Sequence, residues 1–254
     1  NLAGTLTVTT ADNTDDNTIT VITGAAATDV RTSAGAASDT VTIDATALAN
    51  DVNLTLNGDA GAAAGTISIT NFIGNLVTTN ANSGAITVSL VDNTVDNDVT
   101  ISANSNAATD MSITGGAATD TVTINAVAGD IVATGTLSSI LSVTGTSAAQ
   151  TIKGGDGADT ITGAGGNDKL EGGNGADIFI IAAQADHTSS ATITGGGASD
   201  TVRFTSGTGS ETLTVSSAVN VELIEISDAS GDNTGTTALN IDASNNTNAL
   251  SLTG

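Results

Sequence analysis

Three consecutive segments in the middle of the chain combine glycine and aspartate at a fixed spacing. They are residues 154–162, 163–171 and 172–180. Each follows the pattern Gly-Gly-x-Gly-x-Asp-x-apolar-x, apart from Ala164, which replaces the second glycine of the middle segment. Glycine lets the backbone turn tightly and bring its carbonyl oxygens inward, and carboxylate and carbonyl oxygens are the ligands of Ca²⁺. The spacing therefore predicts turns that bind Ca²⁺.

The register of these segments also predicts how they stack. Two nonapeptides make one coil of a parallel β-roll, so turns that lie two segments apart lie on the same side. We expect Asp159 and Asp177 to share an ion between the turns 154–159 and 172–177. The apolar eighth residues are expected to point into the interior between two sheets, and they are Ile161, Leu170 and Phe179.

Asp168 is predicted on the opposite side of the roll. Its stacking partners would be the segments 145–150 and 181–186, which keep the period but lose the glycines. Gln150 replaces the upstream aspartate, whereas Asp186 keeps the downstream one. We therefore expect a second and weaker site on that side.

The predicted ligands fall into two groups. Those of the nonapeptides and their flank are Gly154, Asp156, Gly157, Asp159, Gly163, Gly165, Asp168, Gly172, Asn174, Gly175, Asp177 and Asp186. Those of degenerate turns elsewhere are Asp29, Asp39, Asp110, Asp120 and Asp200. For this second group, and for acidic pairs such as Asp228 and Asp232, the alternative is an Asx-turn that binds only its own backbone.

The charge of the chain supports cation binding. The net charge is −23, and the 27 acidic residues comprise 23 Asp and 4 Glu. Asp suits tight turns and ligates hard cations from them; the alternative is a merely solvated acidic surface. Only four residues are Lys or Arg, which excludes the basic patch that nucleic-acid binding requires.

Alternating apolar and small polar residues predict short β-strands throughout, for example over 5–9, 66–70 and 121–124. Clusters of Gly, Asn, Asp and Ser interrupt the strands every eight to twelve residues. We therefore predict an all-β fold, a repetitive β-solenoid or β-roll-like rod that contains a short parallel β-roll.

Internal repeats predict the organisation of the chain. Related strand-and-turn segments recur about 80 residues apart and place Asp39, Asp120 and Asp200 at equivalent positions. This pattern suggests a first β unit over 1–84, a second over 85–144, the nonapeptides over 145–190 and a third β unit over 191–254.

Residues 145–186 resemble the RTX repeats of toxins, proteases, lipases and surface-layer proteins that type I systems secrete. The Thr-, Ala-, Asn- and Gly-rich, cysteine-free remainder is similar to the RTX surface-layer proteins of Gram-negative bacteria, notably over 220–228 and 238–244. The resemblance implies several Ca²⁺ ions, an extracellular location at the cell surface, and copies of the chain as partners in a two-dimensional lattice. It also implies outer-membrane lipopolysaccharide as a partner, through a part of a longer protein of which we expect this chain to be a fragment.

Other functions compete with a surface lattice. A calcium-stiffened adhesin is the strongest alternative, and the RTX tail of a secreted hydrolase is a weaker one. Ice binding is disfavoured because the Thr-x-Thr pairs are irregularly spaced along the sequence. We expect no enzymatic activity, since the chain has no Cys and one His, His187, which we expect at the surface. No segment predicts a transmembrane helix.

Overall fold

The computed structural model describes residues 2–9, 18–33, 40–49, 52–58, 66–78, 85–91, 98–103, 110–117, 120–125, 129–134, 137–188, 191–215, 218–233, 238–243 and 249–254. The chain forms two compact units, Asn1–Ser139 and Ile140–Gly254. The four segments predicted from the sequence repeats are a finer division than these two units, and they stay a prediction.

The N-terminal unit is built from parallel strands that wind as a β-solenoid. Its strands are β1 (Leu2–Thr9), β2 (Thr18–Ser33), β3 (Thr40–Asp44), β4 (Asn53–Gly58), β5 (Thr66–Phe72), β6 (Asn75–Thr78), β7 (Ile86–Leu90), β8 (Asp98–Ala103), β9 (Met111–Gly115), β10 (Thr121–Asn125) and β11 (Ile131–Ala133).

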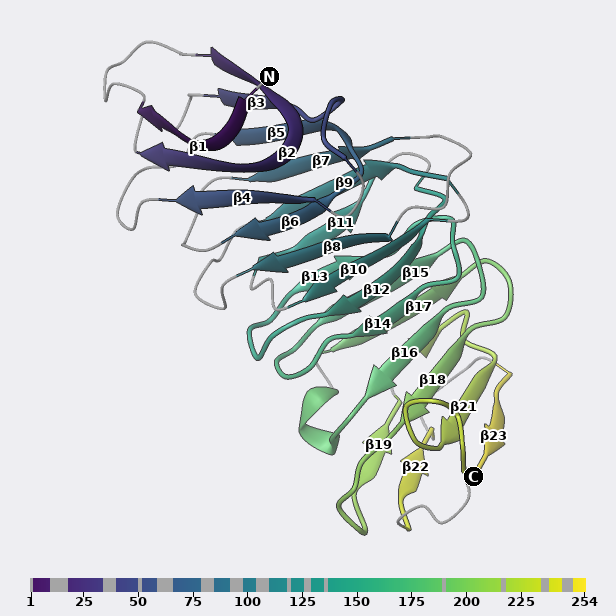
Figure 1. Ribbon diagram of the computed structural model, residues 1–254. Helices are drawn as coiled ribbons and strands as arrows, with labels where there is room; N and C mark the ends of the chain where they lie inside the picture. The colour runs from purple at the N-terminus through teal and green to yellow at the C-terminus, as the bar shows by residue number, and fades with distance from the viewer. Residues whose placement is uncertain are drawn as a thin grey trace. The chain divides into compact units, whose positions relative to one another are not determined.

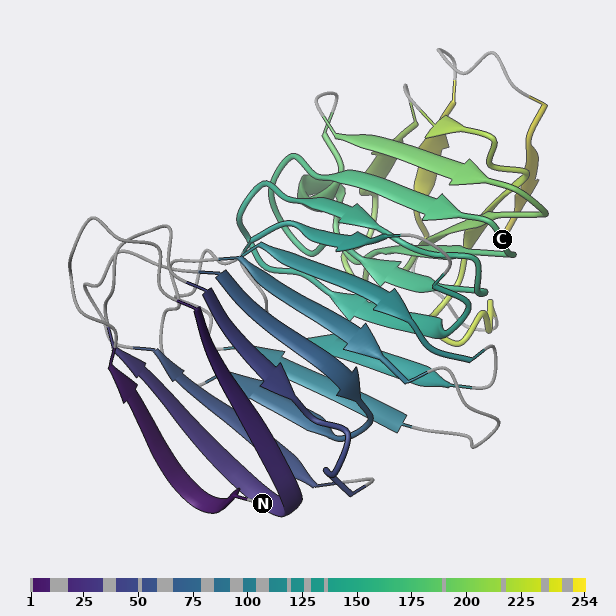
Figure 2. The same cartoon turned by 90° about the horizontal axis from the view of Figure 1, so that it is seen from above.

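Successive strands of this unit alternate between two sheets, which Figures 1 and 2 show from two sides. One sheet contains β1, the second half of β2, β4, β6, β8 and β10, and the other contains the first half of β2, β3, β5, β7, β9 and β11. The long strand β2 therefore belongs to both sheets.

The interior of the N-terminal unit is filled mainly by aliphatic side chains from both sheets, together with the fully buried Phe72. In β7 the pattern of buried and half-buried residues alternates, so that Ile86, Val88 and Leu90 face inward. Thr and Ser take the outward positions between them. This alternation is what a strand with one buried face requires, and it explains why the unit needs few aromatic residues.

The C-terminal unit is built from coils of the same kind. Its elements are β12 (Ile140–Thr144), β13 (Thr151–Lys153), β14 (Thr160–Thr162), β15 (Lys169–Gly173), β16 (Ile178–Ile181), the 3₁₀ helix η1 (Gln184–Asp186), β17 (Thr192–Gly196), β18 (Thr201–Phe204), β19 (Thr212–Thr214), β20 (Ala218–Val219), β21 (Leu223–Ile226), β22 (Asn240–Asp242) and β23 (Ser251–Thr253).

Two parallel sheets enclose the core of this unit. We call them sheet A, with β12, β14, β16, β18, β21 and β23, and sheet B, with β13, β15, β17 and β20. Strands β14, β16 and β18 lie side by side in Figure 1. Strands β19 and β22 form a separate parallel pair.

A row of apolar side chains crosses the inner face of sheet A. The register aligns Ile161 with Phe179, Phe179 with Val202 and Val202 with Ile224. All four side chains are fully buried. The predicted inward direction of the eighth nonapeptide residues is confirmed, because Leu170 is buried from sheet B in the same way.

The all-β prediction is confirmed. The described part of the chain contains parallel strands and one three-residue 3₁₀ helix, and it forms a parallel β-solenoid. Among these residues there is no helix with the length and hydrophobicity needed to pass through a bilayer.

Candidate metal centre

The glycine-rich corners of the C-terminal unit stack in two columns. Column A consists of the corners 154–159, 172–177 and 195–200, each of which leads from sheet B to sheet A. Column B consists of the corners 145–150 and 163–168, which lead from sheet A to sheet B. The sequence places an acidic residue or Gln150 at the end of every corner, directly before the next strand.

The predicted coil period of two nonapeptides is confirmed. Thr151 pairs with Lys169 in sheet B, and Thr160 pairs with Ile178 in sheet A, so that partners are 18 residues apart. The next coil is longer, because Ile178 pairs with Thr201. The connection after β16 supplies these additional residues, and η1 forms within it.

The carboxylates of column A bind the backbone of the preceding coil. Leu141 N donates to Oδ1 of Asp159, Asp159 N donates to Oδ1 of Asp177, and Asp177 N donates to Oδ1 of Asp200, each at 2.8 Å. The ladder ends where Asp200 N donates to Oε2 of Glu222, again at 2.8 Å. Each acidic side chain therefore fixes the register between two coils with one oxygen.

The second oxygen of each aspartate lies against the first glycine of its own corner. A Cβ atom at Gly154 would overlap Asp159 Oδ2 and the carbonyl oxygen of Gly172. A Cβ atom at Gly172 would likewise meet Asp177 Oδ2 and the carbonyl oxygen of Gly195. We call each such arrangement a nook: a glycine without a side chain, one carboxylate oxygen, and one carbonyl oxygen from the next coil.

These carboxylates are buried and electrostatically unfavourable. Asp159, Asp168 and Asp177 are each no more than 2 % exposed. Oδ2 of Asp168, of Asp177 and of Asp200 has no hydrogen-bond partner among the described residues. A buried charge without a partner is costly, so a bound proton or a bound cation stabilises these carboxylates.

The pKa values of these aspartates reflect the same cost of burying a negative charge. Burial raises the pKa of Asp159 and of Asp168 to about 6, and that of Asp177 to about 7. The neighbouring carboxylates Asp159 and Asp200 add to the shift at Asp177. Burial, together with Glu222, also raises the pKa of Asp200. These aspartates therefore lie in surroundings that favour a bound proton or a cation.

Column B holds one aspartate that shares the carboxylate part of this geometry. Gln150 N donates to Oδ1 of Asp168 at 2.9 Å, and a Cβ atom at Gly163 would overlap Asp168 Oδ2. In the corner before it, a Cβ atom at Gly145 would meet Gln150 Oε1 and the carbonyl oxygen of Gly163. The neutral amide of Gln150 thus occupies the place that a carboxylate has in the other nooks.

The prediction that Asp186 stacks in register on Asp168 is wrong. Lys169 pairs with Thr192, and Thr192 N donates to the carbonyl oxygen of Asp168, so that Ala191 takes the stacked position. The cause is the longer connection after β16, in which Asp186 ends η1. Its carboxylate nevertheless lies near Gly165, with Oδ1 3.9 Å from a Cβ atom built there, and contributes to the raised pKa of Asp168.

Two predicted ligands of column A bind each other at the outside of the corners. Asn174 Nδ2 donates to Asp156 Oδ1 at 2.7 Å, and this contact is exposed. Gly175 has a φ of +104°, and a Cβ atom built there would overlap the carbonyl oxygen of Gly157 in the preceding coil. Asp156 and Asn174 therefore link neighbouring corners, while the nooks lie at Gly154 and its equivalents.

Of the predicted ligands in the N-terminal unit, Asp110 and Asp120 have described side chains. Asp39 lies outside the described residues, and Asp29 lies in β2, where only its backbone is described. Asp110 is exposed and its Oδ1 accepts a hydrogen bond of 3.0 Å from Asp130 N. Asp120 is buried and its Oδ2 accepts one of 2.9 Å from Ala117 N. The structure does not bring Asp110 and Asp120 together, since they directly precede β9 and β10, which belong to different sheets.

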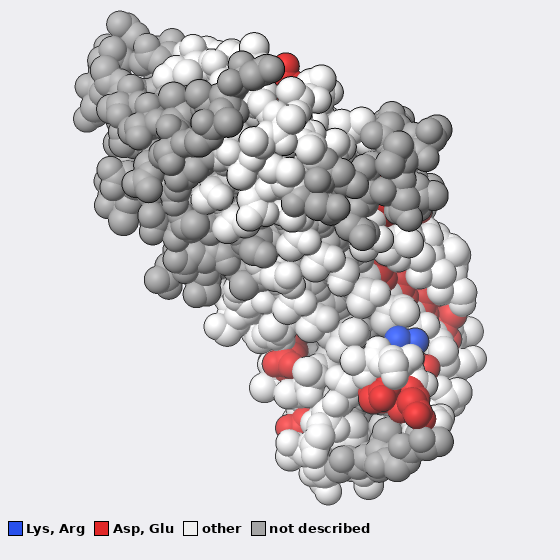
Figure 3. Space-filling view, in the orientation of Figure 1, with Lys and Arg blue, Asp and Glu red and all other residues white. Residues whose placement is uncertain are grey.

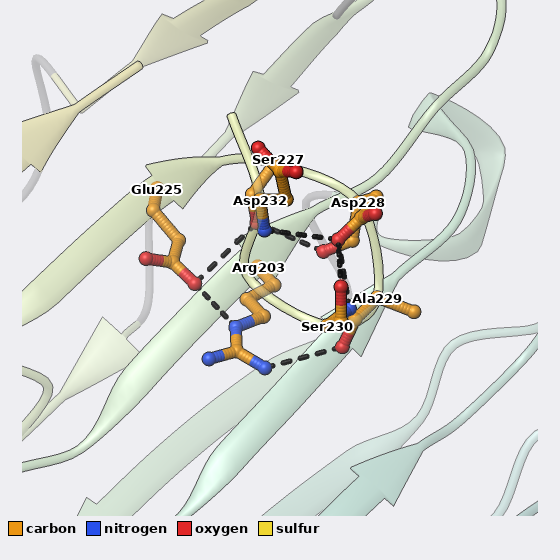
Figure 4. Close-up of polar contacts among 7 residues, drawn as sticks. All are labelled: Arg203, Glu225, Ser227, Asp228, Ala229, Ser230 and Asp232. Carbon is orange, nitrogen blue, oxygen red and sulfur yellow. Dashed lines mark hydrogen bonds and ion pairs between the residues drawn. The ribbon is translucent and has the colours of Figure 1, made fainter. Parts of the chain in front are cut away.

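The acidic pair Asp228 and Asp232 forms a self-contained loop, shown in Figure 4. Oδ1 of Asp228 accepts hydrogen bonds from Ser230 N, from Ser230 Oγ and from Asp232 N. Arg203 pairs with Glu225 and donates to the carbonyl oxygen of Ala229, so a cation already lies beside the loop. Asp228 and Asp232 therefore form an Asx-turn, in which the Asp228 carboxylate binds the backbone of its own loop.

We expected His187 at the surface, and this prediction is wrong. The side chain of His187 is buried, at 3 % exposure. It follows η1 directly and lines an open groove together with Gln184, Glu211 and Thr212. Burial lowers its pKa, so the imidazole is neutral at physiological pH.

Glu222 was missed by the sequence analysis. The signal that identifies Glu222 in the sequence is weak: it is an acidic residue directly before the strand Leu223–Ile226, as Asp200 comes directly before Thr201–Phe204.

Figure 3 shows acidic side chains in clusters on the visible face of the C-terminal unit.

The nooks fit Ca²⁺. They bring backbone carbonyl oxygens and buried carboxylate oxygens together at a glycine, and the carboxylate oxygens of Asp177 and Asp200 have no hydrogen-bond partner. Both kinds of oxygen are hard ligands of the kind that Ca²⁺ takes. Within the described ranges, no three His, Cys, Asp or Glu side chains form a potential metal cluster. Backbone carbonyls must therefore supply much of the coordination.

Comparison with known families agrees with this geometry. Residues 144–179 match the family model of the RTX calcium-binding nonapeptide repeat, in four copies. No curated protein and no solved structure matches the chain. Parallel β-coils with such corners define a calcium-binding β-roll. Residues 144–179 are RTX-type repeats, and Ca²⁺ is the ion that they bind.

Proposed function

We propose that the chain is a structural protein of the cell surface whose folding depends on Ca²⁺ and which assembles with copies of itself into a surface lattice. Calcium acts in this proposal as a switch for folding and assembly, and the chain performs no catalysis. The proposal retains the resemblance to RTX surface-layer proteins, and the experiment below distinguishes a lattice-forming protein from the adhesin.

One observation carries the calcium switch: a stack of buried carboxylates in which the second oxygens of Asp177 and Asp200 lack a hydrogen-bond partner. Asp177 and Asp200 belong to consecutive coils, and Asp177 N binds Oδ1 of Asp200. Oδ2 of both residues is buried without a partner. At neutral pH these charges repel one another unless a cation lies between them. Binding of Ca²⁺ therefore favours the coiled state over the unfolded state.

The architecture supports a structural role. A solenoid gains stability from contacts between neighbouring coils, and its outer faces remain open for contact with other molecules. Outward positions in β5 and β7 carry the small hydroxyl residues Ser68 and Thr87, which the register aligns. Such regular, polar faces suit repeated contacts between copies of one chain.

The location follows from calcium availability. Proteins with RTX repeats are typically secreted, and extracellular calcium modules bind with dissociation constants of about 10⁻⁴–10⁻³ M. We infer that the chain remains unfolded where calcium is scarce and folds outside the cell, at the surface. The proposal includes a contact between outer-membrane lipopolysaccharide and another part of the protein.

The test compares the purified chain in EGTA, in 1 mM Ca²⁺ and in 1 mM Mg²⁺ at equal ionic strength. Circular dichroism measures folding, light scattering measures particle size, and negative-stain microscopy distinguishes sheets from single particles. We expect gain of β structure and ordered sheets with Ca²⁺ alone. Discrete calcium-folded particles would contradict lattice formation and favour the adhesin. An unchanged spectrum in EGTA would contradict the calcium switch itself.

A further inference from the structure

Column A continues beyond the part of the chain that matches the RTX family model. The match ends at residue 179, but β18 and β21 extend sheet A, and β17 and β20 extend sheet B. The corner 195–200 therefore has a neighbour on its far side, formed by residues 220–222 between β20 and β21.

The nook geometry recurs between these two corners. A Cβ atom at Gly195 would overlap Asp200 Oδ2 and the carbonyl oxygen of Asn220. At Gly172, the corresponding atoms are Asp177 Oδ2 and the carbonyl oxygen of Gly195. Asn220 thus takes the place of the first glycine of a nonapeptide, and it does so with a φ of +52°, which asparagine tolerates better than most residues.

The acidic residue of this last corner is Glu222, and the corner is much shorter than a nonapeptide turn. Only Val221 separates Asn220 from Glu222, whereas four residues separate Gly195 from Asp200. Glu222 nevertheless accepts the hydrogen bond from Asp200 N at 2.8 Å, the distance at which Asp200 accepts one from Asp177 N. The longer side chain of glutamate reaches the position that an aspartate reaches from a full turn.

An unpartnered oxygen points to a ligand in this nook. Asp200 is fully buried, and its Oδ2 lies against Gly195 without a hydrogen-bond partner in the described structure. Glu222 brings a second negative charge next to it. Two carboxylates and a carbonyl oxygen around a position without a side chain form a site for a hard divalent cation.

We propose that the corners 195–200 and 220–222 hold a further Ca²⁺ ion, with Asp200, Glu222 and the carbonyl oxygen of Asn220 among its ligands. The site departs from the nonapeptide pattern because Asn-Val-Glu replaces the glycine-rich turn. The ion ties β18 to β21 and so extends the calcium-stabilised part of the unit past the RTX repeats. This inference rests on the proposed calcium-dependent role of the chain.

The experiment counts bound Ca²⁺ per chain by equilibrium dialysis against 1 mM Ca²⁺ and elemental analysis. Glu222→Gln is the decisive variant, because the amide oxygen of Gln preserves the acceptor for Asp200 N and removes the charge. We expect it to bind one ion fewer than the unmodified chain. Asp200→Asn is expected to lose at least that ion.

A matched variant makes the count specific. Glu171→Gln removes one acidic charge from the outer face of sheet B, where Glu171 pairs with Lys169, and it is expected to retain the full number of ions. Circular dichroism in Ca²⁺ verifies that each variant is folded.

The outcomes separate this site from the proposed function. If Glu222→Gln and Asp200→Asn bind as many ions as the unmodified chain while Asp177→Asn binds fewer, the further site does not exist but the calcium switch stands. If the unmodified chain binds no Ca²⁺, both are wrong. Loss of one ion from Glu222→Gln without any lattice in the unmodified chain supports the site and contradicts the lattice.

Discussion

The backbone amide of Asp159 donates a hydrogen bond of 2.8 Å to Oδ1 of Asp177, one coil further along the chain. The other oxygen of Asp177 is buried without a partner. One carboxylate therefore performs two tasks, since it fixes the register of the coils and leaves a negative charge for a cation. This arrangement couples folding to ion binding, because the same side chain is needed for both.

The first prediction concerns the pH dependence of stability without calcium. The pKa of Asp159 and of Asp168 is about 6 in the folded chain and that of Asp177 about 7, against an ordinary value of 3.8. A raised pKa means that the folded state binds protons more strongly than the unfolded state. This contribution to stability is complete below pH 3.8 and is lost as the pH rises through about 6 to 7.

In EGTA, thermal unfolding followed by circular dichroism should therefore show a higher Tm at pH 5 than at pH 8. In 1 mM Ca²⁺ the order is expected to reverse, because protons compete with the ion for the same oxygens. A Tm in EGTA that increases from pH 5 to pH 8 would show that other groups dominate the titration.

The second prediction concerns Asp177→Asn. The amide oxygen of Asn can still accept from Asp159 N, but the buried negative charge is gone. In EGTA the variant should be at least as stable as the unmodified chain at pH 8. In 1 mM Ca²⁺ it should gain less from the ion, by about 1.4 kcal/mol if one site with a dissociation constant of about 0.1 mM is lost.

Urea unfolding with and without Ca²⁺ measures this difference. Asp156→Asn is the matched control, since it removes an aspartate charge of the same column from an exposed position, where it binds Asn174. Equal calcium stabilisation of Asp177→Asn and the unmodified chain would remove Asp177 from the ligands.

The sequence was sufficient to predict the coil period, the inward position of Phe179 and the column that contains Asp159 and Asp177. These features depend on a strict local repeat, in which each position has one structural role. The register of Asp186 was not predictable, because η1 lengthens one connection and shifts the following strand to Thr192. The role of Glu222 was hidden for the opposite reason, since its corner is shortened and a longer side chain compensates.

The third prediction concerns the ion pair of Arg203 and Glu225 (Figure 4). Both side chains are largely buried, at 19 % and 16 % exposure, and Arg203 also holds the loop through Ala229. Arg203→Met should reduce the free energy of unfolding by about 1–3 kcal/mol, because it leaves a buried carboxylate without its charged donor. The number of bound Ca²⁺ ions should not change.

A double-mutant cycle with Glu225→Gln tests whether the two side chains act together. Since the loss in each single variant includes an unpaired group, the double variant should be more stable than the sum of the two losses indicates. Additive losses would mean that Arg203 stabilises the unit through its contacts with the loop rather than through Glu225.

The last prediction compares two glycines in the same unit. A Cβ atom at Gly172 would overlap Asp177 Oδ2 and lie 2.7 Å from the carbonyl oxygen of Gly195, whereas one at Gly207 would meet no atom within 4 Å. Gly172→Ala should therefore fill the nook, reduce the free energy of unfolding by about 1–3 kcal/mol through overpacking and weaken Ca²⁺ binding. Gly207→Ala should change stability by no more than about 0.5 kcal/mol. Urea unfolding and calcium titration of both variants measure these effects side by side, and equal calcium affinity in the two would show that the ion does not depend on the oxygen atoms at Gly172.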